Sequence, residues 1–211
     1  LGQNKKIPVL HDIGSGCLLD PSKFGLTEEP VPRHSISEGA DLCFFSGDKL
    51  IGGPQSGIIV GKKRYVSQLA DHPLARAFRI DKMNLAALNA TLIHYIRGEA
   101  EEKIPIWRML SATKHQLLKR AQILRDRLGG LLTIEETRSA IGGGSFPGFD
   151  IDSVGLVFDN GSPDAMGAKM RKSETPVVCR IEDDCLIFDL RTVLSEEDDA
   201  LVRAILQNVN D

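Results

Sequence analysis

The chain has 211 residues, 42% hydrophobic and 26% charged, which is enough for one large or two small globular domains and excludes a disordered tail. Its formal net charge of −3 excludes an overall excess of positive charge of the kind that binds nucleic acid by neutralising its phosphates. We expect no membrane partner, because no apolar run approaches the roughly 18 residues that a membrane-spanning helix needs. The four cysteines lack both metal-ligand spacing and the density of a disulfide scaffold, so we expect thiols in a reducing cytoplasm and no metal site.

Two expected strands near the start of the chain end beside chemically useful side chains. Residues 7–12 are predicted to form a strand that ends in the carboxylate of Asp12, followed by a tight turn at Gly14-Ser15-Gly16. Residues 41–45 form a continuous apolar run that is typical of a short buried strand. Lys49 follows this second strand, at the carboxyl end where open α/β sheets place their ligands.

The glycine-rich turn after Lys49 contains candidate groups for binding an anion. Gly52 and Gly53 leave backbone N–H groups unshielded, so this turn can approach a phosphate, and the Ser46 hydroxyl adds a donor. A lysine amine, a strand-end carboxylate and phosphate donors together are typical of pyridoxal 5'-phosphate sites. In such a site Lys49 would hold the cofactor as a Schiff base, and Asp12 would keep the pyridine nitrogen protonated. The alternative is an ordinary surface lysine and a carboxylate that caps a strand, and these residues alone leave both interpretations open.

Helices are predicted for the middle of the chain. A short helix at 64–69 follows a strand at 58–60, and a longer helix spans 82–96, where apolar residues recur at helical spacing at Met83, Ala87 and Ala90. Pro105 opens a further helix with one apolar stripe, which Gly129-Gly130 stops. Its opposite faces are basic, and we favour a solvated face over a nucleic-acid contact for Lys114, Lys119, Arg120, Arg125 and Arg127.

Beyond Gly130 the pattern changes to short strands and helices. It predicts a strand at 154–158, a helix at 163–172 and a hairpin formed by 177–181 and 185–190. Ser195, with Asp198 three residues later, is a capping signal for a last helix. The region is therefore expected to form a compact α+β layer with helices packed on an antiparallel sheet.

The residues at both strand ends resemble those of a family, the bacterial L-seryl-tRNA(Sec) selenium transferases, also called selenocysteine synthases. The resemblance is dense from about Asp12 to Tyr95 and thinner afterwards. Its matching segments are Asp12–Gly16, Gly39–Leu42, Ser46–Lys63 and His72–Met83.

The resemblance implies an α/β architecture, the fold-type-I pyridoxal-phosphate transferase fold. Residues 1–100 would be the carboxy-terminal part of the large cofactor domain, 101–130 a connecting helix and 131–211 the small α+β domain. Family members are longer, with an amino-terminal tRNA-binding module and the first half of the large domain. We therefore expect this chain to be the carboxy-terminal half of such a protein, or a truncated homologue.

Carried over by position, the resemblance assigns roles to individual residues. Lys49 would be the Schiff-base lysine and Asp12 the partner of the pyridinium nitrogen. Asp48 is a candidate catalytic residue that would change the electrostatics of Lys49 or position the leaving hydroxyl or the tRNA end. Arg76 and Arg79, expected on one helical face, would bind the phosphate of selenophosphate; ion pairing with neighbouring aspartates is their alternative role.

The reaction implied is the conversion of seryl-tRNA(Sec) to selenocysteinyl-tRNA(Sec), by β-elimination through a dehydroalanyl intermediate and addition of selenium from selenophosphate. The resemblance also implies a homo-oligomer, a decamer, with shared sites in which the turn at Gly52-Gly53 can serve a neighbouring chain's cofactor. Two alternatives stay open. One is a related pyridoxal-phosphate lyase acting on a small amino acid or an amino sugar acid, and the other is a non-catalytic fragment that assembles with a partner chain.

Overall fold

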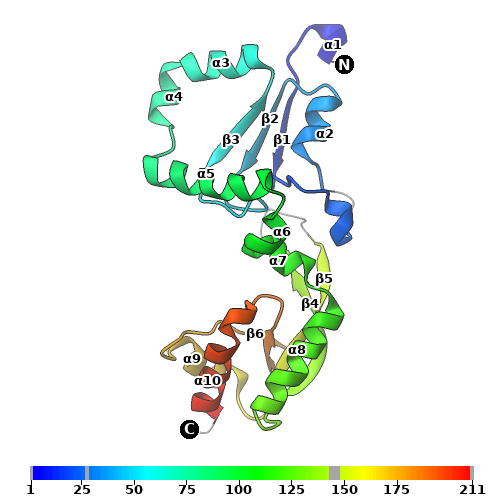
Figure 1. Cartoon of the computed structure of the whole chain (residues 1–211), viewed down its shortest axis with the longest axis vertical. Helices are drawn as coiled ribbons and strands as arrows, with labels where there is room; N and C mark the ends of the chain where they lie inside the picture. The colour runs from blue at the N-terminus through cyan, green and yellow to red at the C-terminus, as the bar shows by residue number, and fades with distance from the viewer. Residues whose placement is uncertain (1, 27–28, 143–147, 210–211) are drawn as a thin grey trace. The chain divides into compact units, whose positions relative to one another are not determined.

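The computed structural model describes residues 2–26, 29–142 and 148–209. The described residues form two compact units: unit 1 contains 2–26, 29–108 and 142, and unit 2 contains 109–141 and 148–209. Each unit has its own sheet, a three-stranded one in unit 1 and a four-stranded one in unit 2 (Figure 1). No described helix is long and apolar enough to cross a membrane.

The sheet of unit 1 has the strand order β1-β2-β3. Strand β1 (Leu10–Gly14) is parallel to β2 (Leu42–Ser46), and the chain crosses between them through α2 (Pro32–Ser37), as a parallel pair requires. Strand β3 (Gly57–Gly61) runs antiparallel to β2. The predicted end of the first strand at Asp12 is wrong, because β1 continues to Gly14 through a register shift.

Both helices that were predicted between residues 64 and 96 are present in unit 1. The long helix α5 has the predicted bounds, and the Asp81 carboxylate caps it by accepting from the N–H groups of Met83 and Asn84. The short helix after β3 is confirmed as α3. The described helices of unit 1, other than α2, are α1 (Gly2–Lys5), η1 (Pro21–Phe24), α3 (Lys63–Asp71), α4 (Pro73–Ala77), α5 (Lys82–Ile96) and α6 (Ala100–Lys103).

The buried face of α5 differs from the predicted stripe. Met83 is 82% exposed, whereas Leu88 is buried, and Leu92 and Tyr95 pack against the cluster formed by Cys43, Phe45, Ile51 and Leu88. Since α5 carries apolar residues on nearly all sides, their spacing does not identify which face meets the sheet.

The single helix predicted from Pro105 onward is wrong, because two helices occupy this stretch. Helix α7 (Pro105–Ser111) ends before Thr113, and α8 (Lys114–Arg127) begins there. The Thr113 side chain accepts from the Gln116 N–H, and the Gln116 side chain accepts from the Thr113 N–H, which is a capping box that starts a new helix. The division between the units falls after Arg108, within α7.

The sheet of unit 2 is antiparallel throughout, in the order β4-β5-β7-β6. Helix α8 packs on β4 and β5, α9 packs on β7, and α10 contacts both helices. The core contains Leu124, Leu156, Met170, Leu186 and Ile205. The remaining elements are β4 (Thr133–Ala140), β5 (Asp150–Phe158), α9 (Pro163–Arg171), β6 (Arg180–Glu182), β7 (Cys185–Asp189), η2 (Ser195–Glu197) and α10 (Asp198–Val209).

The strand predicted at 154–158 begins earlier, at Asp150, and the first hairpin strand predicted at 177–181 spans Arg180–Glu182. A further strand and the cap of the last helix also differ from the prediction. Strand β4 was not foreseen, because its sequence TIEETRSA is mostly polar and has no apolar run. Ser195 does not cap the last helix: it lies in η2, and the Leu194 N–H donates to Glu197 Oε2 at 3.2 Å instead.

The basic side chains of α8 are mostly engaged within unit 2. Arg120 donates to the carbonyls of Leu190, Val193 and Leu194 and pairs with Asp198. The other ion pairs are Lys114–Glu136, Arg125–Asp126 and Arg127–Asp199. These contacts favour a structural role for the basic face over a nucleic-acid contact.

Candidate active site

Lys49 lies in the turn of residues 47–56 that joins β2 to β3, and this turn is closed by its own backbone. The Gly47 N–H donates to the Ser56 carbonyl at 2.9 Å, and the Gly53 N–H donates back to the Gly47 carbonyl at 2.8 Å. The Gly52 N–H donates to the Lys49 carbonyl at 2.9 Å, with Gly52 at a φ of 71° that favours glycine. The backbone therefore holds Lys49 in a defined position.

The structure brings Lys49 beside the turn that follows β1. A Cβ atom built on Gly14 would lie 3.7 Å from Lys49 Nζ, and Gly14 has a left-handed φ of 65°. The Leu50 N–H donates to the Ser15 carbonyl at 3.1 Å. A Cβ on Gly16 would lie only 2.7 Å from the Ser46 carbonyl oxygen, so the two strand ends touch. The turn that carries Lys49 therefore lies against the end of β1.

The charged groups at this edge of the sheet have few partners. Asp12 is exposed, and its Oδ1 accepts from the Gly14 N–H at 3.1 Å. Among the described residues, neither the half-buried Lys49 nor the exposed Asp48 has a hydrogen bond or an ion pair through its side chain. An amine without a carboxylate partner can bond to a ligand without first breaking an ion pair.

The expected phosphate donors are not all available. The N–H groups of Gly52 and Gly53 are both donated inside the turn, so the prediction that they are free for an anion is wrong in this structure. Their missing side chains instead allow close packing: a Cβ on Gly52 would lie 2.4 Å from Ile104, and one on Gly53 would lie 3.3 Å from Leu88. The half-buried Ser46 hydroxyl has no hydrogen bond within the described part of the chain.

Arg76 and Arg79 do not share a helical face as predicted. Helix α4 ends at Ala77, so Arg76 lies in its last turn and Arg79 lies beyond it. Both arginines are exposed, and Asp81 is engaged in capping α5. In residues 2–26, 29–142 and 148–209, no hydrogen bond or ion pair joins either arginine to an aspartate, to Lys49 or to Asp12.

Burial keeps the nearby thiols protonated. Cys17, beside the β1 turn, is fully buried, and burial raises the pKa of its thiol to about 12. Burial also raises the pKa of Cys43 on β2. Neither thiol is a nucleophile near neutral pH, because the thiolate is the reactive form. All four cysteines are free, and the described residues contain no cluster of three or more potential metal ligands.

Sequence reasoning missed two residues that fix the Lys49 turn. The Tyr95 hydroxyl on α5 reaches the carbonyls of Leu50 and Ile51, and the fully buried Trp107 donates to that hydroxyl. The available signal was the spacing of Leu88, Leu92 and Tyr95, which places them on one helical face. Because α5 is apolar almost all round, that face did not stand out.

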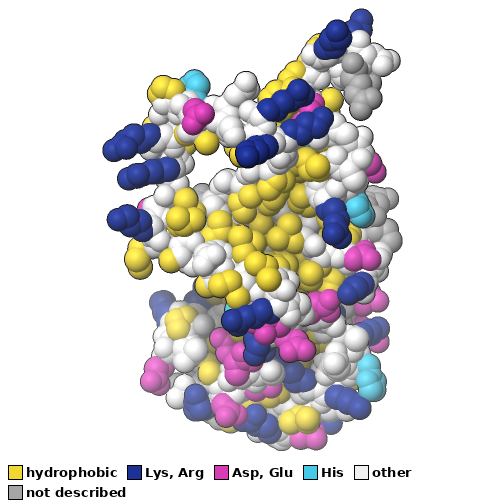
Figure 2. All heavy atoms as spheres, turned by 45° about the horizontal axis from the view of Figure 1, so that its top comes forward, with side chains coloured by type: hydrophobic (Ala, Val, Ile, Leu, Met, Phe, Trp, Pro, Cys, Tyr) yellow, Lys and Arg dark blue, Asp and Glu magenta, His cyan; other side chains and the backbone are white. Residues whose placement is uncertain are grey.

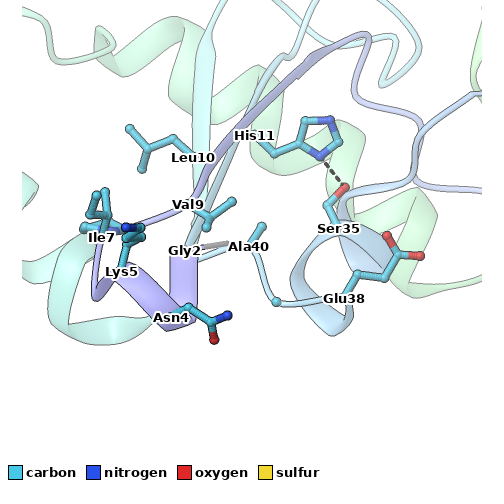
Figure 3. A pocket seen from close by; sticks show the side chains of 12 residues that line it. Gly2, Asn4, Lys5, Ile7, Val9, Leu10, His11, Ser35, Glu38 and Ala40 are labelled. Carbon is cyan, nitrogen blue, oxygen red and sulfur yellow. Dashed lines mark hydrogen bonds between the residues drawn. The ribbon is translucent and has the colours of Figure 1, made fainter.

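Other surfaces of unit 1 carry apolar side chains. A hollow of about 820 Å³ lies beside the amino-terminal part of β1, lined in part by Ile7, Val9 and Leu10 (Figure 3). At its rim His11 Nδ1 lies 2.9 Å from Ser35 Oγ of α2. A broad apolar area is also visible on unit 1 (Figure 2). Phe78 and Met83, each more than four-fifths exposed, belong to the same unit.

Comparison with known proteins identifies the family. The model of the family described as "SelA: L-seryl-tRNA selenium transferase" matches residues 1–194. The L-seryl-tRNA(Sec) selenium transferase of Carboxydothermus hydrogenoformans is 42% identical over 97% of this chain and 46% of its own length. That of Moorella thermoacetica is 41% identical over 98% of this chain and 46% of its own length. The chain thus spans about half the length of these curated relatives.

A solved structure shares the fold. D-glucosaminate-6-phosphate ammonia-lyase superposes with a TM-score of 0.62 at 19% identity, over 99% of this chain and 51% of that protein. The predicted fold class, part of the large domain of a fold-type-I enzyme followed by a small α+β domain, is confirmed. On the match over residues 1–194 and the relatives above 40% identity, the chain belongs to the SelA family of L-seryl-tRNA selenium transferases.

Proposed function

We propose that the full-length protein containing this chain converts seryl-tRNA(Sec) to selenocysteinyl-tRNA(Sec) with selenophosphate, using pyridoxal 5'-phosphate bonded to Lys49. The observation that carries the proposal is family membership over residues 1–194. The unpartnered Lys49 amine beside the β1 turn supports it independently. The activity belongs to the whole protein, of which this chain supplies the lysine.

The residues around Lys49 suit this cofactor in two respects. A Cβ on Gly14 would lie in ordinary van der Waals contact with Lys49 Nζ, at 3.7 Å, so the bare glycine leaves the room of a side chain next to the amine. The Ser15 hydroxyl is buried without a hydrogen-bond partner in the described structure, so it is free to form a hydrogen bond with a ligand. For the phosphate we propose Ser46 as a donor. We keep Gly52 and Gly53 as the residues that shape the turn, because their own N–H groups are engaged.

The proposed chemistry uses an acid–base pair from two strand ends. Pyridoxal phosphate, when bound, supplies an electron sink for carbanion formation. Lys49 Nζ removes the proton from the α-carbon of the seryl group, and the Asp12 carboxylate holds a proton on the ring nitrogen. The β-hydroxyl then takes up a proton and leaves as water, and a carbon–carbon double bond remains. The selenium of selenophosphate adds to the β-carbon, the α-carbon takes up a proton, and the P–Se bond breaks as water accepts the phosphoryl group. We propose that Asp48, next to Lys49, acts on the leaving hydroxyl or on the charge of the amine.

Arg76 and Arg79 are proposed to bind the phosphate of selenophosphate. Both guanidinium groups are exposed and have no carboxylate partner among the described residues, so they can take up an anion without losing an ion pair. Because this chain has a net charge of −3, we propose that most contacts with the tRNA come from elsewhere in a homo-oligomeric protein.

The test is a product assay on the full-length protein. With seryl-tRNA(Sec) and selenophosphate we expect selenocysteinyl-tRNA, and no product from Lys49→Ala. Lys82→Ala, which removes an exposed lysine of α5, is the matched control. Turnover of free serine or an amino sugar acid without turnover of the charged tRNA would favour a related lyase instead.

A further inference from the structure

Tyr95 connects the Lys49 turn to helix α5. Its hydroxyl lies 3.0 Å from the Leu50 carbonyl oxygen and 2.9 Å from the Ile51 carbonyl oxygen, so its proton is shared between the carbonyls of the two residues that follow Lys49. The same hydroxyl accepts from Trp107 Nε1 at 2.6 Å. The bonds from Tyr95 to the Leu50 and Ile51 carbonyls join residues more than forty positions apart along the chain.

The Tyr95 contact completes the immobilisation of the residues around Lys49. The Leu50 N–H is held by the Ser15 carbonyl, and the Lys49 carbonyl is held by Gly52. Those bonds run from backbone to backbone, whereas the described side-chain hydrogen bonds to the Leu50 and Ile51 carbonyls come from Tyr95. The Tyr95 hydroxyl is therefore the described side-chain group that holds the backbone immediately after Lys49.

The surroundings make this contact rigid. Leu50 is 1% exposed and Ile51 and Trp107 are fully buried, so water does not replace a lost donor at low cost. The Trp107 ring packs against Phe24, with ring centroids 5.1 Å apart. Burial raises the pKa of Tyr95 well above its ordinary value, so the hydroxyl keeps its proton near neutral pH.

We propose that Tyr95 is a positioning residue for Lys49, fixing the direction of its amine through the Leu50 and Ile51 carbonyls. The importance of that direction rests on the proposed function, in which Lys49 is the reactive amine. Misplacement of a reacting group by about 1 Å can cost two orders of magnitude in rate. The hydroxyl acts through the backbone and touches no substrate.

The test compares Tyr95→Phe with the wild type in the cofactor-free full-length protein. Lys49 is acylated at fixed pH with a small amine-reactive ester, and its labelling rate is read by peptide mass spectrometry against Lys63 in the same sample. We expect Tyr95→Phe to change this ratio by at least about threefold, because the amine samples other directions. Trp107→Phe, which removes the donor to the hydroxyl, should shift the ratio the same way by less. Tyr65→Phe removes a hydroxyl that bonds to Arg64 on α3 and should change nothing.

Each outcome decides the matter. An unchanged labelling ratio in a folded Tyr95→Phe protein overturns the proposal. A Tyr95→Phe protein that does not fold also counts against the proposal, because the hydroxyl would then stabilise unit 1 and not fix the direction of the Lys49 amine. Failure of Lys49 to bond the cofactor would refute the proposed function. The labelling rate can still be measured in that case, because it needs neither cofactor nor turnover.

Discussion

At the scale of single residues, the proposed function depends on Asp12 acting with Lys49. Asp12 is exposed and lies two residues before the glycine that faces the lysine amine. Replacing it by asparagine removes the charge that would hold a proton on the cofactor ring. We expect Asp12→Asn to lower the single-turnover rate by about 10²-fold or more, a range typical of acid–base groups.

The rate is measured with saturating seryl-tRNA(Sec) and selenophosphate. Asp71→Asn is the matched control, since it neutralises an exposed aspartate of α3 and should leave the rate unchanged. A rate for Asp12→Asn within error of the wild type would remove Asp12 from the site.

A second prediction at the scale of single residues concerns Arg120 and the stability of unit 2. The Arg120 side chain is 18% exposed, and its guanidinium group is held by three carbonyls and Asp198. We expect Arg120→Ala to destabilise unit 2 by about 2–4 kcal/mol, because it leaves a mostly buried carboxylate and three carbonyls without their donor. Urea unfolding followed by circular dichroism measures this loss. Lys119→Ala, on an exposed position of the same helix, should cost under about 0.5 kcal/mol.

At the scale of elements, Asp41 joins the three strands of unit 1. Its Oδ2 accepts from the Val9 N–H at 2.8 Å, and its Oδ1 lies 2.7 Å from Lys62 Nζ, just past β3. The hydrogen bond with Lys62 lowers the pKa of Asp41, with further lowering by the Val9 N–H. The charged form therefore stabilises the fold above the unfolded pKa of about 4, and this contribution is lost as the pH falls through the lower folded pKa.

The prediction is a stability difference that depends on pH. Wild type should exceed Asp41→Asn in free energy of unfolding at neutral pH, and the difference should shrink as the pH is lowered below about 4. Urea unfolding at a series of pH values checks it. A difference that stays constant across that range would show that the Asp41 charge does not matter.

Much of this architecture could be predicted, for physical reasons that particular elements make clear. Helix α5 has its predicted bounds because Asp81 caps it, and β2 was found because it is a short apolar run. Strand β4 was missed because a polar edge strand has little apolar signal, and the buried face of α5 because the helix is apolar almost all round. The engaged amides of Gly52 and Gly53, and the Tyr95 contact, follow from tertiary packing that no local pattern encodes.

At the scale of the whole molecule, each unit has its own hydrophobic core. The single tryptophan, Trp107, lies in unit 1, so its fluorescence follows the unfolding of that unit alone. We expect Arg120→Ala to lower the unfolding midpoint of unit 2 seen by circular dichroism and to leave the fluorescence midpoint unchanged. Equal shifts of both signals would mean that the chain unfolds as one cooperative body.

The central claim is that Lys49 is the residue that bonds the cofactor, and one measurement addresses it directly. The full-length protein is incubated with pyridoxal 5'-phosphate, reduced with borohydride so that any lysine-bound cofactor is fixed, digested and mapped by mass spectrometry. We expect one phosphopyridoxyl group per chain, on Lys49, and none in Lys49→Ala. Stoichiometric labelling of another lysine, or a wild-type protein that carries no label while forming selenocysteinyl-tRNA, would contradict it.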